Sequence, residues 1–224
     1  MLPAMLAATM VVALGNASAE AAMLTYNYPG PVISVDDELS CPFSVGDSLS
    51  GSYTFESTTA ARTGSTSQFA VFDALSSASY TVASYTATST AAPEIQVDDV
   101  MNADRYGVIS RVSDGLTGAD VAGIPLIAAS FRLDDNTGMV FNTALDLPTS
   151  LDLNDFSSSL FFLQFFASES NQLYSVVGTL ETLELQQPGV VPEPSSFILA
   201  SIGVVALGFV GVRRRRNHLA KSAK

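Results

Sequence analysis

Three closely spaced pairs of aspartates are the residues of this chain that could most readily do chemistry. They are Asp98 with Asp99, Asp134 with Asp135, and Asp152 with Asp155. Two carboxyl groups at a suitable separation can serve as acid and as base or nucleophile in the hydrolysis of a glycoside. Adjacent strand residues point to opposite faces, however, so sequence neighbours rarely converge on one site. The chain also has no Trp to stack on a sugar ring. We therefore predict that the protein is not an enzyme, and we nominate no catalytic residue.

The single cysteine and the single histidine exclude further classes of site. Cys41 has no second cysteine with which to form a disulfide or a zinc cluster, and we expect an inert, partly buried thiol. His218 lies near the end of the sequence, so all earlier residues lack an imidazole. Ser–His and Cys–His nucleophile systems and His-ligated metals are therefore excluded from that earlier part.

Two acidic segments offer carboxylate oxygens of the kind that calcium prefers. They are DDE at 36–38 and LDDNTG at 133–138. The second segment does not match the EF-hand order, because Asp134, Asn136 and Gly138 place the glycine one position too early. Asp and Asn also bond their own backbone in turns, and we favour that role here. We predict no metal site and no cofactor, while calcium binding stays open as an alternative.

Charge is distributed very unevenly along the chain. All 22 acidic residues precede Arg213, whereas only four basic residues do, and the formal charge up to that point is −18. The four basic residues are Arg62, Arg105, Arg111 and Arg132. A body this acidic would be repelled by phosphate backbones, so we predict no nucleic acid partner.

The first residues predict an export signal. An apolar stretch at residues 2–14 is followed by Ala17-Ser18-Ala19, which fits the A-x-A rule for signal peptidase with cleavage before Glu20. The stretch is too short to cross a bilayer comfortably. No Lys or Arg precedes Arg62, which departs from the usual basic start of such signals and would be explained by a start codon further upstream.

An uncharged stretch of sixteen residues, 197–212, lies directly before four arginines. As a helix it would span about 24 Å at ~1.5 Å per residue, slightly short of the ~30 Å hydrocarbon core. No polar stripe at helical spacing marks it as a buried core helix. Guanidinium groups resist transfer through hydrocarbon, so residues 213–216 should stay in the cytoplasm. We predict a transmembrane helix with the acidic body outside the cytoplasm.

The tripeptide Pro192-Glu193-Pro194 lies immediately before this stretch. Neither proline fits a helix interior, and Pro194 restricts Glu193 towards extended geometry, so an exposed strap is expected. This tripeptide, followed by an apolar helix and an arginine cluster at the end of the chain, resembles the PEP-CTERM sorting signal of Gram-negative bacteria.

The resemblance implies processing by exosortase, a membrane-embedded enzyme thought to cut at or near the motif, with this protein as its substrate. Pro192, Glu193 and Pro194 match the recognition motif. Residues 197–212 match the membrane helix, and the cytoplasmic stop corresponds to Arg213, Arg214, Arg215 and Arg216. The implied partners are exosortase, the secretion machinery with signal peptidase, and the membrane.

The residues between the two ends predict an all-β domain, with short apolar segments separated by turn formers. In SLSGSYTFES, Leu49, Tyr53 and Phe55 share one face and polar residues take the other, as in a half-buried strand. About eight such strands predict a single β-sandwich, with a jelly roll as one compatible arrangement. The other expected strands are residues 79–87, 94–99, 106–112, 126–134, 159–167 and 174–185.

Several local features are also predicted. Residues 126–134, a DDNTG turn and MVFN at 139–142 predict a hairpin. The apolar run at 160–163 predicts a strand covered on both faces. A shift of the apolar face within 174–185 predicts a bulge. Residues 69–75 could hold a short helix, although tertiary context could make them a strand.

The body is also similar, more loosely, to a common subtype of PEP-CTERM proteins. In that subtype VGDSLSGSYTFES, here residues 45–57, precedes a long domain that ends in a GTL strand, here residues 178–180. This similarity favours a β fold and implies no activity. The Ser/Thr tracts at 57–67 and 76–90 are either exposed β surface or carriers of O-linked sugar.

These features divide the chain into a signal peptide at 1–19, a β-sandwich at 20–190, a sorting signal at 191–216 and a cytoplasmic tail at 217–224. By resemblance, the protein is an exported, non-enzymatic surface or matrix protein of a Gram-negative bacterium. It would be held transiently in the inner membrane, processed by exosortase, and then associated with exopolysaccharide in a biofilm. The alternative is a glycan- or calcium-binding module of the cell envelope.

Overall fold

The computed structural model describes residues 21–91 and 93–186, which form strands and three short 3-10 turns without any α-helix. The all-β prediction is therefore confirmed, with more strands than the eight expected. The strands are β1 (Met23–Val35), β2 (Ser48–Glu56), β3 (Phe69–Phe72), β4 (Leu75–Val82), β5 (Tyr85–Ser89), β6 (Glu94–Val100), β7 (Ala103–Arg111), β8 (Leu116–Thr117), β9 (Leu126–Asp135), β10 (Ser158–Ala167), β11 (Gln172–Thr179) and β12 (Glu184–Gln186). The 3-10 turns are η1 (Asp37–Leu39), η2 (Val112–Asp114) and η3 (Leu153–Asp155).

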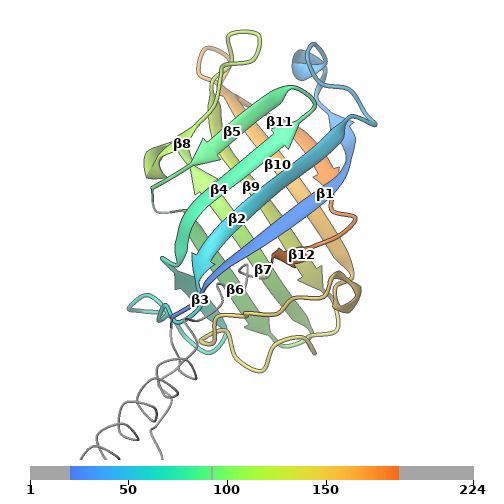
Figure 1. The fold of residues 1–224 in the computed structure, drawn as a ribbon. Coiled ribbons are helices and arrows are strands. Elements are labelled where there is room, and N and C mark those ends of the chain that lie inside the picture. The colour runs from blue at the N-terminus through green and yellow to red at the C-terminus, as the bar shows by residue number, and fades with distance from the viewer. Residues whose placement is uncertain (1–20, 92, 187–224) are drawn as a thin grey trace, which may run out of the picture. The chain divides into compact units, whose positions relative to one another are not determined.

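The strands form one continuous, curled antiparallel sheet. Its order is β3-β6-β7-β9-β10-β11-β1-β2-β4-β5-β8, with β12 beside β1. Figure 1 shows β1, β2, β4 and β5 as one layer in front of the layer that contains β9, β10 and β11. Because side chains alternate along a strand, each strand turns one set of residues into the space between the layers and the other set outward.

The strand β1 connects the two layers and was not anticipated from the sequence. It pairs with β2 from Met23 to Pro31, and with β12 and β11 on its other edge. Its centre contains Pro29 and Pro31, residues that normally argue against a central strand. Pro29 lies between the part of β1 that pairs with β12 and the part that pairs with β11. Its carbonyl accepts from the N–H of Glu181. The prolines therefore occupy a gap in the ladder, where a missing N–H costs little.

Three local predictions need correction or refinement. Residues 69–72 form β3, which pairs with β6, so a neighbouring strand decides against a helix there. The stretch 174–185 does not contain a bulge within one strand: β11 ends at Thr179, and β12 pairs with β1. On β10 the outer residues Leu160 and Phe162 are only half-buried, so the strand is not covered on both faces by the described residues. The guanidinium of Arg132 lies 6.0 Å from the Phe162 ring centre and covers part of it.

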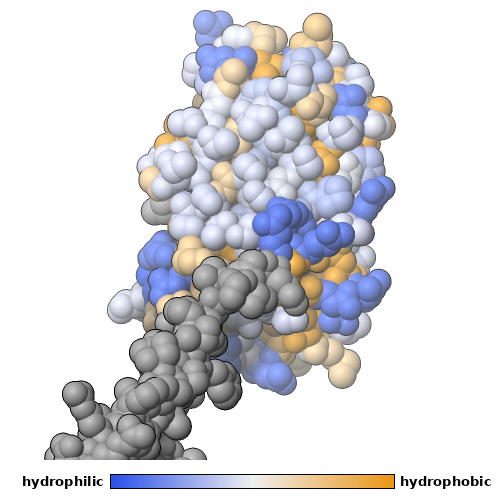
Figure 2. Space-filling model, in the orientation of Figure 1, coloured by the Kyte–Doolittle hydropathy of each residue, from blue (hydrophilic) through white to orange (hydrophobic). Residues whose placement is uncertain are grey.

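The outer face of the β1–β2–β4–β5–β8 layer consists largely of hydroxyl side chains. The successive register partners across this layer are Asn27, Ser52, Ser79, Thr88 and Thr117. The Ser52 and Ser79 hydroxyls lie 3.0 Å apart, and cross-strand hydroxyl pairs of this kind contribute modestly to sheet stability. Figure 2 shows this face as pale, neither strongly hydrophilic nor strongly hydrophobic.

The core between the layers is unusually rich in tyrosine. Five tyrosines are at most 1% exposed: Tyr26, Tyr28, Tyr53, Tyr80 and Tyr106. A buried hydroxyl requires a partner, and each of these has one. Tyr26 donates to Thr149 O, Tyr28 to Ser79 O and Tyr106 to the Tyr53 oxygen, while Tyr80 shares a 2.8 Å bond with the Ser110 hydroxyl. Burial raises the pKa of Tyr80 and of Tyr106 well above the usual value, so both hydroxyls stay neutral.

The ring of Phe131, on β9, joins the two layers. Its centroid lies 5.0 Å from that of Tyr28 on β1, 5.2 Å from that of Tyr53 on β2, and 6.3 Å from that of Tyr106 on β7. Aromatic pairs at such separations add to the energy of area burial. The side chain is fully buried, so its removal would leave a cavity that the surrounding rings can only partly fill.

We expect Phe131→Ala to lower the free energy of unfolding by about 3–5 kcal/mol, because transfer and cavity terms add. Urea unfolding followed by tyrosine fluorescence measures this difference. Phe69→Ala is the matched control, since Phe69 is 46% exposed at a sheet edge. A loss for Phe131→Ala as small as that of the control would contradict the role of this ring.

Candidate functional site

Residues 136–157 connect β9 to β10 and form no strand, so the hairpin expected from residues 126–142 is wrong. The physical reason lies in the backbone N–H groups of residues 137–141. Met139 N–H donates to Asp135, while Val140 N–H and Phe141 N–H both donate to Asp104. Amides that donate to carboxylates are not available for a ladder with β9.

Asp104 and Asp135 are register partners at the ends of β7 and β9, and both side chains are buried. Asp104 Oδ2 accepts from Val140 N and Phe141 N at 2.8 Å each. Asp135 accepts from Thr137 N at 2.9 Å, from the Thr137 hydroxyl, and from Met139 N at 3.0 Å. The Met139 N–H, followed by the Thr137 hydroxyl, holds the pKa of Asp135 below its usual range. The two carboxylates thus anchor the connecting segment.

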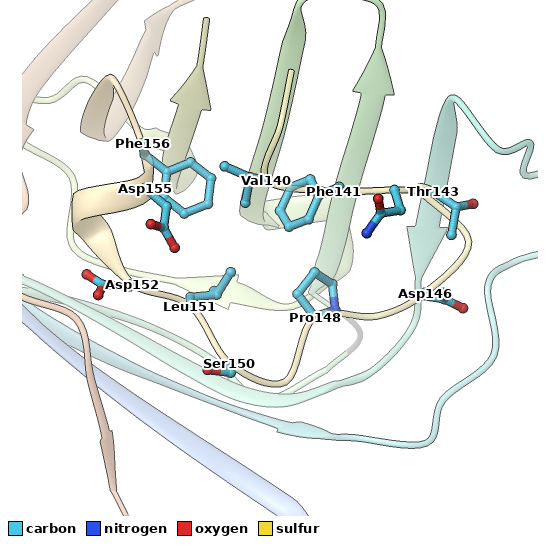
Figure 3. A pocket seen from close by; sticks show the side chains of 11 residues that line it. Val140, Phe141, Thr143, Asp146, Pro148, Ser150, Leu151, Asp152, Asp155 and Phe156 are labelled. Atoms are coloured by element: carbon cyan, nitrogen blue, oxygen red, sulfur yellow. The ribbon is translucent and has the colours of Figure 1, made fainter. Parts of the chain in front are cut away.

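The anchored segment encloses a cavity of about 270 Å³, drawn in Figure 3. Phe141 and Phe156 form its apolar side, with ring centroids 6.1 Å apart. Figure 3 places Asp146 on one side of the cavity and Asp152 and Asp155 on the other. Asp152 accepts from Asn154 N at 2.9 Å and from Asn154 Nδ2 at 2.7 Å, as the cap of η3. Its carboxylate is therefore occupied by a structural role.

The other two aspartate pairs diverge, as the alternation of strand side chains requires. On β9, Asp134 points outward and accepts from Arg105 Nε at 2.8 Å and from Arg132 Nε at 2.7 Å, whereas Asp135 is buried. On β6, Asp98 shares the outer side with Arg105, at 3.4 Å, and Asp99 follows on the opposite face. Burial raises the pKa of Asp98 against the opposing effect of Arg105.

In each of the two acidic segments one aspartate has a structural partner, which is distant in sequence for Asp36 and local for Asp135. Asp36, in the DDE segment, accepts from Ser175 N at 2.7 Å and ties η1 to β11. Asp135, in the LDDNTG segment, closes the turn through Thr137 and Met139. Across residues 21–91 and 93–186, no group of three or more His, Cys, Asp or Glu side chains is arranged to hold a metal ion.

Cys41 is exposed, which corrects the expectation of a partly buried thiol. It follows η1 in an irregular connection, in which Phe43 is buried in the core while Cys41 faces outward. Asp104 was not singled out from the sequence, because one aspartate at the end of a strand is ordinary and its contacts come from a segment more than thirty residues later.

The residues predicted to act in export and sorting lie outside the described part of the chain. They are Ala17, Ala19, Pro192, Glu193, Pro194, Arg213, Arg214, Arg215 and Arg216, and the predicted helix at 197–212 and His218 also lie there. In the part that the structure describes, no helix has the length and hydropathy needed to cross a membrane.

We expect Asp135→Asn to destabilise the protein at neutral pH, because Asn cannot supply the anion that accepts from Thr137 and Met139. The depressed pKa of Asp135 contributes stability above the unfolded pKa of about 3.9, which is lost as the pH falls through the folded value. The melting temperatures of the wild type and the variant should therefore differ at pH 7 and converge as the pH is lowered through the depressed pKa of Asp135.

Asp146→Asn is the control for this experiment. Asp146 is an exposed carboxylate of the same segment and makes no hydrogen bond within residues 21–91 and 93–186. Its neutralisation should leave the melting curve nearly unchanged at every pH. A gap between wild type and Asp135→Asn that stays constant down to low pH would show that the charge of Asp135 does not anchor the segment.

Comparison with known proteins locates one family feature in this chain. A family model of the PEP-CTERM protein-sorting motif matches residues 190–216. No curated protein and no solved structure matches the chain. The match coincides with the proline-flanked glutamate, the uncharged stretch and the four arginines. The chain is therefore a protein that carries a PEP-CTERM sorting domain at its carboxyl end.

Proposed function

We propose that this protein is a non-enzymatic substrate of exosortase, exported across the inner membrane of a Gram-negative bacterium and sorted to the cell surface or extracellular matrix. The observation that carries the proposal is the match of residues 190–216 to the PEP-CTERM protein-sorting motif. In this proposal Pro192, Glu193 and Pro194 form the processing motif, and residues 197–212 form a transient transmembrane helix. The cytoplasmic stop is Arg213, Arg214, Arg215 and Arg216, followed by a short tail at 217–224.

In this proposal residues 191–216 direct the sorting, and residues 20–190 are the domain that is transported. An uncharged stretch of sixteen residues suits hydrocarbon, and four arginines resist passage through it. The body, which we propose is a single β-sandwich over residues 20–190, would then lie outside the cytoplasm. A strongly acidic body favours solubility and hydration in that compartment.

The carboxylates of the described body support a structural protein rather than a hydrolase. Asp104, Asp135 and Asp152 accept from backbone amides, and Asp134 accepts from two arginines. We propose that the body associates with exopolysaccharide in a biofilm or floc after its release from the membrane helix.

Mass spectrometry of the mature protein from its native host tests the processing step. We expect a carboxyl terminus near Glu193, because Pro192, Glu193 and Pro194 form the proposed processing motif. Replacement of Pro192, Glu193 and Pro194 by Ala should leave a chain that ends at Lys224 and stays in the membrane fraction. Glu184→Gln, at an exposed position of β12, should be processed as the wild type is. A wild-type protein that retains Lys224 would reject sorting by cleavage.

The amino-terminal signal makes a separate prediction. Cleavage after Ala19 should give a mature chain that begins at Glu20, with the small residues Ala17 and Ala19 in the peptidase site. Ala19→Leu should block cleavage and leave the precursor on the membrane. Ala21→Leu, beyond the cleavage point, should not. Edman sequencing of the exported protein measures the terminus, and a mature protein that still begins at Met1 would exclude this site.

A further inference from the structure

A hollow lies on the outer face of β6, β7, β9 and β10, on the side of the molecule away from the hydroxyl-rich layer. Its volume is about 370 Å³. The register places Gln96, Gly107, Arg132 and Leu160 in one row across the four strands. The next row runs through Ile109, Ser130 and Phe162, and the row after it contains Gln164. The hollow is therefore centred on Gly107, with amide, guanidinium and aromatic groups around it.

Gly107 has no structural reason to be glycine. A Cβ atom built at this position would meet only the carbonyl oxygen of Phe131, at 3.8 Å, which is an ordinary contact. Gly107 is also absent from the residues with a positive φ angle. A glycine inside a strand weakens it by roughly 0.5–1 kcal/mol relative to Ala. Where the chain itself does not need the space, such a glycine can mark a place where a ligand approaches the backbone.

The other strand glycines show the contrast. A Cβ at Gly30 would collide with the Thr179 carbonyl, at Gly51 with the Tyr28 hydroxyl, and at Gly178 with the Leu49 side chain. Each of these three glycines is required by close packing against the rest of the protein. Of the strand glycines in residues 21–91 and 93–186, Gly107 alone has room for a Cβ atom, and it lines the hollow.

The groups around Gly107 retain hydrogen-bonding capacity. Arg132 uses Nε for Asp134, and its two Nη groups make no bond with any described residue. Gln96 donates Nε2 to Glu94 at 2.7 Å and keeps its carbonyl oxygen free. The amide of Gln164 and the hydroxyl of Ser130 also have no partner among residues 21–91 and 93–186. Donors and acceptors thus alternate around an apolar patch made by Ile109 and Phe162.

The positive and negative side chains at the hollow are equal in number, which favours a neutral ligand. Arg105 and Arg132 are held by Asp98 and Asp134, so two positive charges face two negative ones. An anion would gain little attraction from guanidinium groups that are already paired. The acidic body would also repel a polyanion at longer range. A neutral molecule with many hydroxyl groups suits this surface better, because each hydroxyl both donates and accepts and the carbon face of a sugar packs on an aromatic ring.

We propose that this hollow, with Gly107 as its floor, binds a neutral saccharide chain. The ring face of one residue packs against Phe162 and Ile109, while its hydroxyls bond Gln164, Gln96, Ser130 and the Arg132 Nη groups. The carboxylates of Asp98 and Asp134 position the arginines and are not themselves ligands. This inference deepens the proposed association with exopolysaccharide and rests on it only for the nature of the polymer met outside the cell.

Gly107→Val tests the proposal, because a Cβ atom has room at this position, the valine methyl groups would occupy the hollow, and valine suits a strand. The full chain is purified in a detergent without a sugar headgroup and titrated calorimetrically with cellohexaose, maltohexaose and oligogalacturonate. We expect at least one neutral hexaose to bind the wild type and its affinity to fall by ~10-fold or more in Gly107→Val. Gln164→Ala, which breaks no hydrogen bond within the described residues, should weaken the same binding.

Ser50→Val is the matched control, since it adds a valine at an exposed position on the outer face of β2. It should bind as the wild type does, the circular dichroism of all variants should be alike, and Gly107→Val should not melt below the wild type. The proposal is overturned if neither neutral hexaose binds, if only oligogalacturonate binds, or if Gly107→Val binds normally. It is equally overturned if Ser50→Val loses binding to the same degree. None of these results depends on cleavage near Glu193, so failure here leaves the sorting proposal standing.

Discussion

The alternation of side chains along extended strands is the constraint on which this structure depends. It sends Leu49, Tyr53 and Phe55 of β2 into the core and leaves serines and threonines outside. The same alternation separates Asp134 from Asp135 by placing one carboxylate among surface arginines and the other under a connecting segment. Two neighbouring residues of one type therefore acquire different partners, and a pair that suggests acid–base chemistry in the sequence is divided between two faces.

Buried polar groups hold specific segments in place through hydrogen bonds. The buried tyrosines supply large apolar area for the core, and their hydroxyls bond carbonyls or hydroxyls contributed by other parts of the chain. Asp104 and Asp135 hold the connection between β9 and β10 by accepting from its amides. Because an unsatisfied buried polar group is costly, these bonds favour one path for a segment that has no ladder of its own.

The two outer faces of the curled sheet differ in chemistry. Hydroxyl side chains cover the layer that contains β2, β4 and β5, and they bond one another across strands. The four arginines of the described body lie around the other layer, each beside at least one carboxylate. That second face carries paired charges, amides and a partly covered phenyl ring, which suit the proposed contact with a hydroxyl-rich molecule. The sorting motif at residues 190–216 is separate in sequence from this face and is proposed to direct transport of the whole body.

The sequence by itself determined the features that depend on local composition. The sorting motif could be found because it consists of prolines, an apolar stretch and arginines in a fixed order along the chain. Strands such as β2 could be predicted because apolar and polar residues alternate along them with a period of two. Only the tertiary structure decided that β1 passes through Pro29 and Pro31, that residues 69–72 become a strand, and that residues 140–141 bond to Asp104 instead of forming a hairpin. The role of Gly107 likewise required the packing around it. Each of these outcomes depends on a partner far away in sequence, and local patterns carry no record of which distant donor, acceptor or strand edge will be brought within reach.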